Sequence, residues 1–274
     1  MERKRDLRRI FPSVLDRAYE LYKKRRLVRD IMSTDVVTIE PGSNMKMAAR
    51  LMGAMRIGSL VVLDEEPIGI VTERDLLSKV MAKGRDPSKV RVSSVMSSPL
   101  VTISKESTIK GAAKTMISGK GRLVVLEDGR MIGIVTASDL IKSLPDAPDT
   151  LLQVEGFMTS PVVTRPYDTS VVDVARLMGK ERIGSVIITE NELPGGIFTE
   201  RDLLTTLLAE GIDLDVPVGD YASSPIIVAG KRITAHEAAY IMTTHRIKRL
   251  PLVDEDEVLV GIVTARDLVE AYSK

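Results

Sequence analysis

Cysteine and tryptophan are absent from this chain of 274 residues, and histidine occurs only 2 times, as His236 and His245. Without cysteine, a disulfide scaffold, a thiol nucleophile and an iron–sulfur centre are excluded. Two histidines cannot build a multi-histidine metal site, so we expect no metal centre. No run reaches the roughly 18 consecutive apolar residues that a membrane-spanning helix needs. Because the N-terminus also lacks the apolar core of a signal peptide, we expect a cytoplasmic protein.

Aromatic residues make up only 3% of the chain, and side-chain amides are limited to Gln153, Asn44 and Asn191. Scarce amides beside abundant Lys, Arg and Glu are typical of thermophile proteins. Charge is plentiful but balanced, with 39 Lys and Arg against 38 Asp and Glu, and hydrophobic residues make up 44%. This composition predicts a globular protein with a buried core, and the length suggests about two domains.

A pattern of Gly-apolar-apolar-Thr-x-x-Asp occurs four times, and its Asp residues lie 64, 63 and 65 residues apart. Such regular spacing indicates an internal repeat. The four copies are Gly69–Asp75, Gly133–Asp139, Gly196–Asp202 and Gly261–Asp267. Each copy is preceded, in the same phase, by a polar turn, a helical pattern and an apolar run. The helical patterns contain Met52, Met116, Met178 and Met242, which we expect in the core.

Each repeat is predicted to have the element order β-α-β-β-α, which makes the fold class α+β. Apolar, β-branched runs between turn signals indicate buried strands, and the Thr of each pattern begins a helix. Ser43 is the expected cap of the first helix in repeat one. One repeat buries too little apolar surface to be stable alone, so we expect the repeats to pair.

The repeats also show a longer period. Repeats one and three share Arg-Ile-Gly-Ser and Thr-Glu-Arg-Asp-Leu-Leu, whereas repeats two and four have Thr-Ala-x-Asp. This pattern indicates a pair of repeats that was duplicated once. We predict a basic N-terminal helical arm (1–27), a first pair (28–143, with repeats 28–80 and 91–143), a proline-containing linker (144–153) and a second pair (154–272, with repeats 154–210 and 217–272).

The four motif copies, each with its preceding strand and helix pattern, resemble cystathionine-β-synthase (CBS) domains over residues 28–272. In this family two repeats pack through their sheets into a Bateman module, so the resemblance implies two Bateman modules and a homodimer. It also implies binding of adenosine-containing ligands, namely AMP, ADP, ATP, S-adenosylmethionine or methylthioadenosine. CBS repeats carry no catalytic chemistry, so we expect a non-enzymatic sensor that regulates a partner protein still to be identified.

The motif residues have a physical rationale as a ligand site. A Thr hydroxyl and the free N–H groups at a helix start favour an anion. The Asp three residues later lies near the same helix start and can accept hydrogen bonds from two vicinal ribose hydroxyls. Plain helix capping by the same Thr and Asp is the alternative interpretation. The candidate ribose and phosphate residues are Thr72, Asp75, Thr136, Asp139, Thr199, Asp202, Thr264 and Asp267.

Basic residues are candidates for phosphate contacts. The chain is similar to the family of the nucleotide-sensing subunit of AMP-activated protein kinase, in which basic residues before the middle strand hold phosphates. That similarity implies this role for Arg122, Lys248 and Arg249. Arg74 and Arg201, inside the motif, are further candidates, and Arg266 matches them in repeat four. The alternative for all of them is a solvated charge.

An adenine ring needs a flat apolar slot, and the turn-to-strand segments of the four repeats can supply one. With so few aromatic residues, we expect aliphatic clamping instead of stacking. The slot candidates are Thr34, Val36, Pro99, Pro161, Val162, Pro225 and Ile226.

Residues 1–29 carry 11 basic residues against 4 acidic ones, and their apolar residues recur at helical spacing. Three roles for this arm remain open: docking on an acidic module, contact with nucleic acid, or association with an anionic membrane surface. The leading hypothesis for the chain is an adenine-nucleotide sensor. The alternatives are a sensor of S-adenosylmethionine or methylthioadenosine, a ligand-responsive DNA or RNA regulator, and a purely structural module with empty clefts.

Overall fold

The computed structural model describes residues 17, 21, 26–119, 121–144, 152–191, 193–208 and 210–273. Most of the predicted basic arm (1–27) lies outside the described residues, and so do its predicted helix and docking. The same holds for most of the predicted linker (144–153).

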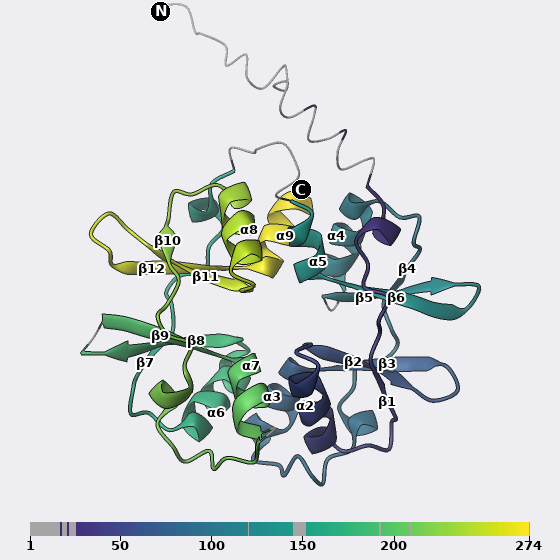
Figure 1. Ribbon diagram of the computed structural model, residues 1–274, viewed down its shortest axis with the longest axis horizontal. Helices are drawn as coiled ribbons and strands as arrows, with labels where there is room; N and C mark the ends of the chain where they lie inside the picture. Colours follow the sequence, from purple (N-terminus) through teal and green to yellow (C-terminus); the bar gives the residue numbers. More distant parts are fainter. Residues whose placement is uncertain are drawn as a thin grey trace, which may run out of the picture. The chain divides into compact units, whose positions relative to one another are not determined.

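All four repeats have the predicted order β-α-β-β-α (Figure 1). Repeat one contains β1 (Thr38–Ile39), α2 (Met45–Ala54), β2 (Ser59–Leu63), β3 (Pro67–Thr72) and α3 (Glu73–Lys79). Repeat two contains β4 (Thr102–Ile103), α4 (Ile109–Ser118), β5 (Arg122–Glu127), β6 (Arg130–Thr136) and α5 (Ala137–Lys142).

Repeat three contains β7 (Thr164–Pro166), α6 (Val171–Glu181), β8 (Ser185–Glu190), β9 (Leu193–Thr199) and α7 (Glu200–Asp202), which a π-helical turn (Leu203–Leu208) continues. Repeat four contains β10 (Ala229–Gly230), α8 (Ala235–Thr244), β11 (Arg249–Val253), β12 (Leu259–Thr264) and α9 (Ala265–Ser273). Each repeat begins with a short 3₁₀ turn whose first residue is a fully buried valine, namely Val28, Val92, Val154 and Val218.

Each repeat forms one three-stranded sheet in which the middle strand pairs parallel to the first strand and antiparallel to the third. The middle strands are the predicted apolar runs, and Leu60, Val61 and Val62 in β2 are all fully buried. The predicted core methionines of the first helices are confirmed, since Met52, Met116, Met178 and Met242 are at most 1% exposed.

The first helix of every repeat begins at a side-chain cap. In repeat one this cap is Asn44, whose side chain accepts a hydrogen bond from the Met47 N–H, so the prediction of Ser43 is wrong by one residue. Asn and Ser cap helices about equally well, so composition alone could not choose between the two neighbours. Thr108, Ser170 and Thr234 cap the equivalent helices.

The capping hydrogen bonds of α8 predict how the stability of the protein depends on pH. Hydrogen bonds from the backbone and side chain of Thr234 lower the pKa of the Glu237 carboxyl, with a smaller effect from His236. A lowered folded-state pKa stabilises the fold above the unfolded-state value, and this stability is lost as pH falls through the folded value. Glu237→Ala should therefore melt below the wild type at pH 7, and the gap should shrink towards pH 3 or so. Thermal melts across this range measure it, and a constant gap would contradict the explanation.

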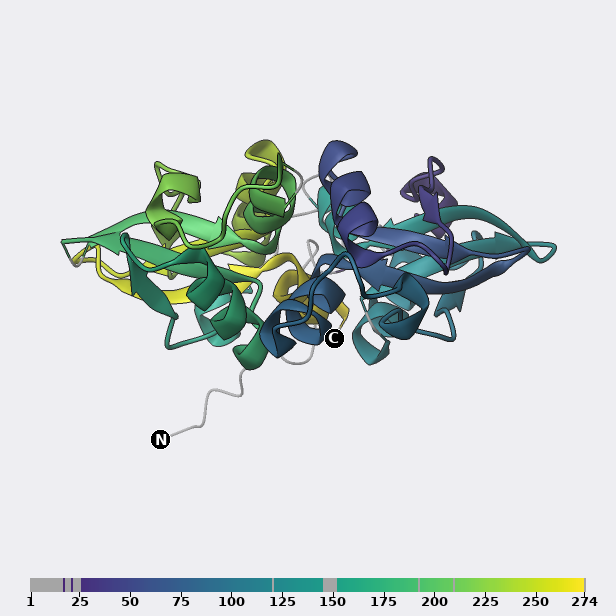
Figure 2. The same cartoon turned by 90° about the horizontal axis from the view of Figure 1, so that it is seen from below.

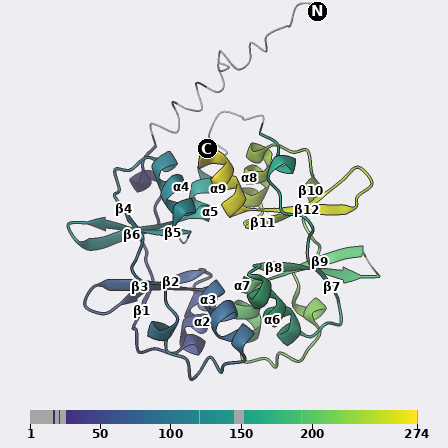
Figure 3. The same ribbon diagram turned by 180° about the vertical axis from the view of Figure 1, so that it is seen from behind.

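The chain divides into two compact units that combine repeats distant in sequence. Residues 35–100 and 161–227 form the one–three unit, named after its repeats. The described parts of 1–34, 101–160 and 228–274 form the two–four unit. In the one–three unit, α3 packs on α6, and α2 packs on the turn Leu203–Leu208. Figures 1 and 2 show the helices of this unit between its two sheets. In the two–four unit, α9 packs on α4, α5 and α8, which Figure 3 shows from behind.

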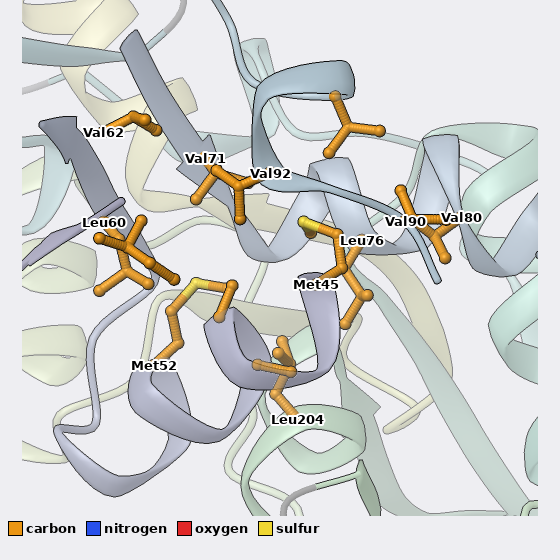
Figure 4. Packing of buried hydrophobic residues seen from close by; sticks show 14 residues of the cluster. Met45, Met52, Leu60, Val62, Val71, Leu76, Val80, Val90, Val92 and Leu204 are labelled. Atoms are coloured by element: carbon orange, nitrogen blue, oxygen red, sulfur yellow. The ribbon is translucent and has the colours of Figure 1, made fainter. Parts of the chain in front are cut away.

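Repeats one and three exchange leucines between their cores. Leu76 of α3 lies in the core of its own repeat, whereas the next residue, Leu77, lies in the core of repeat three. Reciprocally, Leu203 stays in repeat three, and Leu204 enters the core of repeat one beside Met45 and Met52 (Figure 4). All four leucines are at most 1% exposed. The Leu-Leu pair after the motif in repeats one and three therefore contributes to two cores at once.

Leu204→Ala should destabilise repeat one although it lies in the sequence of repeat three. Removing a fully buried leucine typically costs about 2–5 kcal/mol because a cavity remains. We expect a lower urea midpoint and faster hydrogen exchange in residues 45–54. Leu193→Ala, at a site that is 70% exposed, is the control and should change stability by less than about 0.5 kcal/mol. Unchanged exchange in 45–54 would contradict the shared core.

Candidate functional site

The last strand of each repeat turns into its helix at the motif Thr. Thr72 ends β3 and is the N-cap of α3, and its hydroxyl donates to Asp75 Oδ2 over 2.7 Å. The Thr72 backbone N–H donates to the same oxygen over 2.9 Å, and the Asp75 N–H donates back to the hydroxyl oxygen over 3.2 Å. The same pair of hydrogen bonds from Thr to Asp Oδ2 forms in the other three repeats.

Thr and Asp thus make capping hydrogen bonds in every repeat, and these bonds limit how a ligand can bind. Because the single hydroxyl proton of Thr goes to the carboxylate, this hydroxyl cannot also donate to a phosphate. Asp Oδ1 takes no part in the capping bonds, so any hydrogen bond from a sugar hydroxyl has to use this second oxygen. The acids lie close to the protein interior, with Asp75 6% and Asp139 9% exposed.

In repeats two and four, a cation lies opposite the motif Thr. The strand register places Arg122 opposite Thr136 and Arg249 opposite Thr264. Lys248 precedes Arg249, and its carbonyl accepts a hydrogen bond from the first N–H of α9. The structure thus brings three of the predicted phosphate candidates to the strand end that carries the motif. In repeats one and three the same positions are Ser59 and Ser185.

Arg74 and Arg201 have protein partners in the opposite repeat of the one–three unit. Arg74 Nε lies 3.5 Å from Glu200 Oε1, and Arg201 Nε lies 4.0 Å from Glu73 Oε1. Arg201 also donates to the carbonyl of Arg56. A phosphate role for these two arginines remains a prediction, and it would compete with these contacts.

Sequence reasoning missed Glu73 and Glu200, which are each 7% exposed. The available signal was that Thr-Glu-Arg-Asp occurs only in repeats one and three, the two repeats that pack together. Repeats two and four have Ala137 and Ala265 instead. Arg266 of repeat four nevertheless reaches repeat two, where it donates to the Ile117 carbonyl.

The motif glycines leave room for another segment of the chain to pass close to the last strand of each repeat. The segment before the first strand of one repeat pairs with the last strand of another, as Ser97 does with Ile70 and Ser33 does with Ile134. A Cβ on Gly69 would lie 2.7 Å from Met96 Sδ and 3.0 Å from the Ser97 carbonyl oxygen. The close approach at this glycine is therefore to the protein's own chain. Equivalent pairs join Ser223 to Ile197 and Thr159 to Ile262.

Gly69→Ala should destabilise the protein more than Gly196→Ala. The Ser97 carbonyl near Gly69 is held by reciprocal backbone hydrogen bonds with Ile70, so it cannot move away cheaply. At Gly196 a Cβ would meet Ala222 Cβ at 3.1 Å and the Ser223 carbonyl at 3.3 Å. Overpacking typically costs about 1–3 kcal/mol, which we expect for Gly69→Ala. Urea unfolding of both variants measures the difference, and equal destabilisation would contradict the steric account.

The predicted adenine-slot residues lie in irregular segments just before the first strands. Thr34, Pro99, Pro161 and Pro225 are exposed, whereas Val36, Val162 and Ile226 are half-buried. The apolar slot thus remains a prediction, carried by the half-buried aliphatic side chains.

Among the described residues, no group of three or more His, Cys, Asp or Glu side chains could hold a metal ion. In that same part of the chain, no helix is both long and apolar enough to cross a membrane.

The chain belongs to the CBS domain family, which matches it over residues 28–82, 92–146, 154–209 and 218–274. A CBS domain-containing protein of Bacillus subtilis, YhcV, is 31% identical over 115 residues, covering 42% of this chain and 81% of that protein. A protein of Methanopyrus kandleri, MK0525, is 38% identical over 122 residues, covering 43% of this chain but only 62% of that protein.

Solved structures confirm the fold over most of the chain. The crystal structure of MJ1225 from Methanocaldococcus jannaschii has a TM-score of 0.75 at 21% identity, and the match covers 90% of this chain and 100% of that one. A protein from Pyrococcus horikoshii has a TM-score of 0.63 at 20% identity, covering 90% and 99%. Four CBS repeats in one chain are therefore an architecture that this protein shares with others.

Proposed function

We propose that the protein is a regulatory sensor that binds an adenine nucleotide (AMP, ADP or ATP) at the motif turns of the two–four unit and has no catalytic activity of its own. One observation carries this proposal: in repeats two and four, the motif Thr and Asp share a strand end with Arg122 or Arg249. MJ1225, which has the same fold, is described as a candidate archaeal homologue of g-AMPK.

The chemistry divides between the residues of that strand end. Oδ1 of Asp139 or Asp267 accepts hydrogen bonds from the ribose hydroxyls, because Oδ2 is occupied by Thr. Arg122, Lys248 and Arg249 bind the phosphates, a role that the capped Thr hydroxyl cannot fill. Each charge-assisted hydrogen bond contributes about 1.5–3 kcal/mol.

Regulation follows if the nucleotide binds one arrangement of the chain more tightly than another, since a ligand shifts an equilibrium only by its differential affinity. We propose that the shift is read by a protein partner and that the protein acts as a homodimer built through its Bateman modules.

Asp267→Asn is the sharpest test of the ribose contact. The Asn carbonyl oxygen can still accept the two hydrogen bonds from Thr264, so the cap survives, but the amide nitrogen that replaces Oδ1 cannot accept from a hydroxyl. We expect titration calorimetry to show at least about tenfold weaker AMP binding at the affected site. 2′-Deoxy-AMP should bind wild type weakly and lose less on mutation.

Arg249→Gln tests the phosphate contact. It should weaken ATP and AMP binding while leaving adenosine binding nearly unchanged, because adenosine has no phosphate. Titrations with S-adenosylmethionine run in parallel, and preferential binding of that ligand would favour the alternative sensor. If AMP, ADP, ATP and S-adenosylmethionine all give no heat with the wild type, the proposed function is wrong.

A further inference from the structure

The motif acids of repeats one, two and four differ in what lies next to their second oxygen. In repeat one, Lys79 Nζ lies 2.7 Å from Asp75 Oδ1, one helical turn along α3. The same ammonium donates to the Val95 carbonyl over 2.5 Å, so two hydrogen-bond partners fix its position. The Asp75 side chain is 9% exposed and that of Lys79 is 38% exposed. The carboxylate therefore already has a cationic partner that belongs to its own helix.

Repeats two and four lack this close ion pair. Lys142 Nζ lies 3.9 Å from Asp139 Oδ1, which is beyond hydrogen-bond length. In repeat four the residues three and four places after Asp267 are Glu270 and Ala271, so no lysine occupies either position. Within the described residues, the hydrogen bonds that the Asp267 carboxylate accepts come from Thr264, and both use Oδ2.

The number of acceptor sites decides what each acid can bind. A carboxylate has about four lone-pair sites, two on each oxygen. Thr72 takes both sites on Asp75 Oδ2, and Lys79 takes one on Oδ1. One site remains, whereas the two hydroxyls of a ribose need two. For Asp139 and Asp267, no donor among the described residues lies within hydrogen-bond distance of Oδ1, so both acceptor sites on this oxygen remain open to a ligand.

We propose that Lys79 closes the motif acid of repeat one to sugar diols, so that nucleotides bind at the motif turns of repeats two and four and not at that of repeat one. This inference rests on the proposed function. A ribose at Asp75 would have to displace an ammonium from a nearly buried carboxylate and would leave the Val95 carbonyl without its donor. The repeat pattern alone would assign a ligand to the motif turn of repeat one. Lys79 excludes the ligand there and is thus a specificity-determining residue.

The experiment is calorimetric titration of AMP into the full chain and into Lys79→Met, which keeps the length of the side chain without its charge. We expect Lys79→Met to bind one more equivalent of AMP per chain than the wild type. The double variant Lys79→Met/Asp75→Asn should lose this added equivalent. Lys142→Met is the matched control, and because its ammonium is already beyond hydrogen-bond range of Asp139, it should leave the number of equivalents unchanged. Circular dichroism verifies that each variant is folded.

The outcomes separate this inference from the proposed function. A folded Lys79→Met that gains no site overturns the inference, as does one that loses a site, since Lys79 would then itself contact phosphate. Loss of a wild-type equivalent in Asp75→Asn alone also overturns it. If the wild type binds no AMP and Lys79→Met binds one equivalent, the inference stands and the proposed sites in repeats two and four fall.

Discussion

The two hydrogen bonds from a Thr main chain and hydroxyl to one Asp oxygen fix the point at which each last strand becomes a helix. Because the strand and helix share this residue, the antiparallel register of the hairpin is set relative to the helix start. The residue that lies opposite Thr is then always the first residue of the middle strand, whether Ser59, Arg122, Ser185 or Arg249. A local capping interaction thereby decides which side chains can act together at the site.

The two kinds of repeat use the same turn differently. In the one–three unit the residues after Thr are Glu and Arg, and they form ion pairs between repeats one and three. In the two–four unit the corresponding glutamates are replaced by alanines, and arginines lie across from Thr instead. Under the proposed function, the motif charges of the one–three unit mainly hold its helices together, and the cations opposite Thr in the two–four unit also bind a ligand.

The sequence predicted the four repeats, their element order and the buried methionines, because each depends on local spacing and apolar pattern. It could not predict that Leu77 and Leu204 leave their own repeats, since two adjacent leucines on a helix look alike until the neighbouring helix is known. The sequence could not show which segment approaches Gly69, because that segment, at Ser97, lies outside the motif. The pairing of Lys79 with Asp75 follows an i,i+4 spacing on the helix, which the sequence itself contains.

The exchange of leucines has a consequence for biosynthesis. A ribosome makes the chain from its N-terminus, so every strand and helix of repeat one is translated well before Leu204 exists. Until then, the pocket around Met45 and Met52 is unfilled, and the nascent repeat exposes apolar surface. Repeat one therefore reaches its final packing only after the segment with Leu204 has been made, together with repeat three, and a chain truncated before that leucine should depend on chaperones.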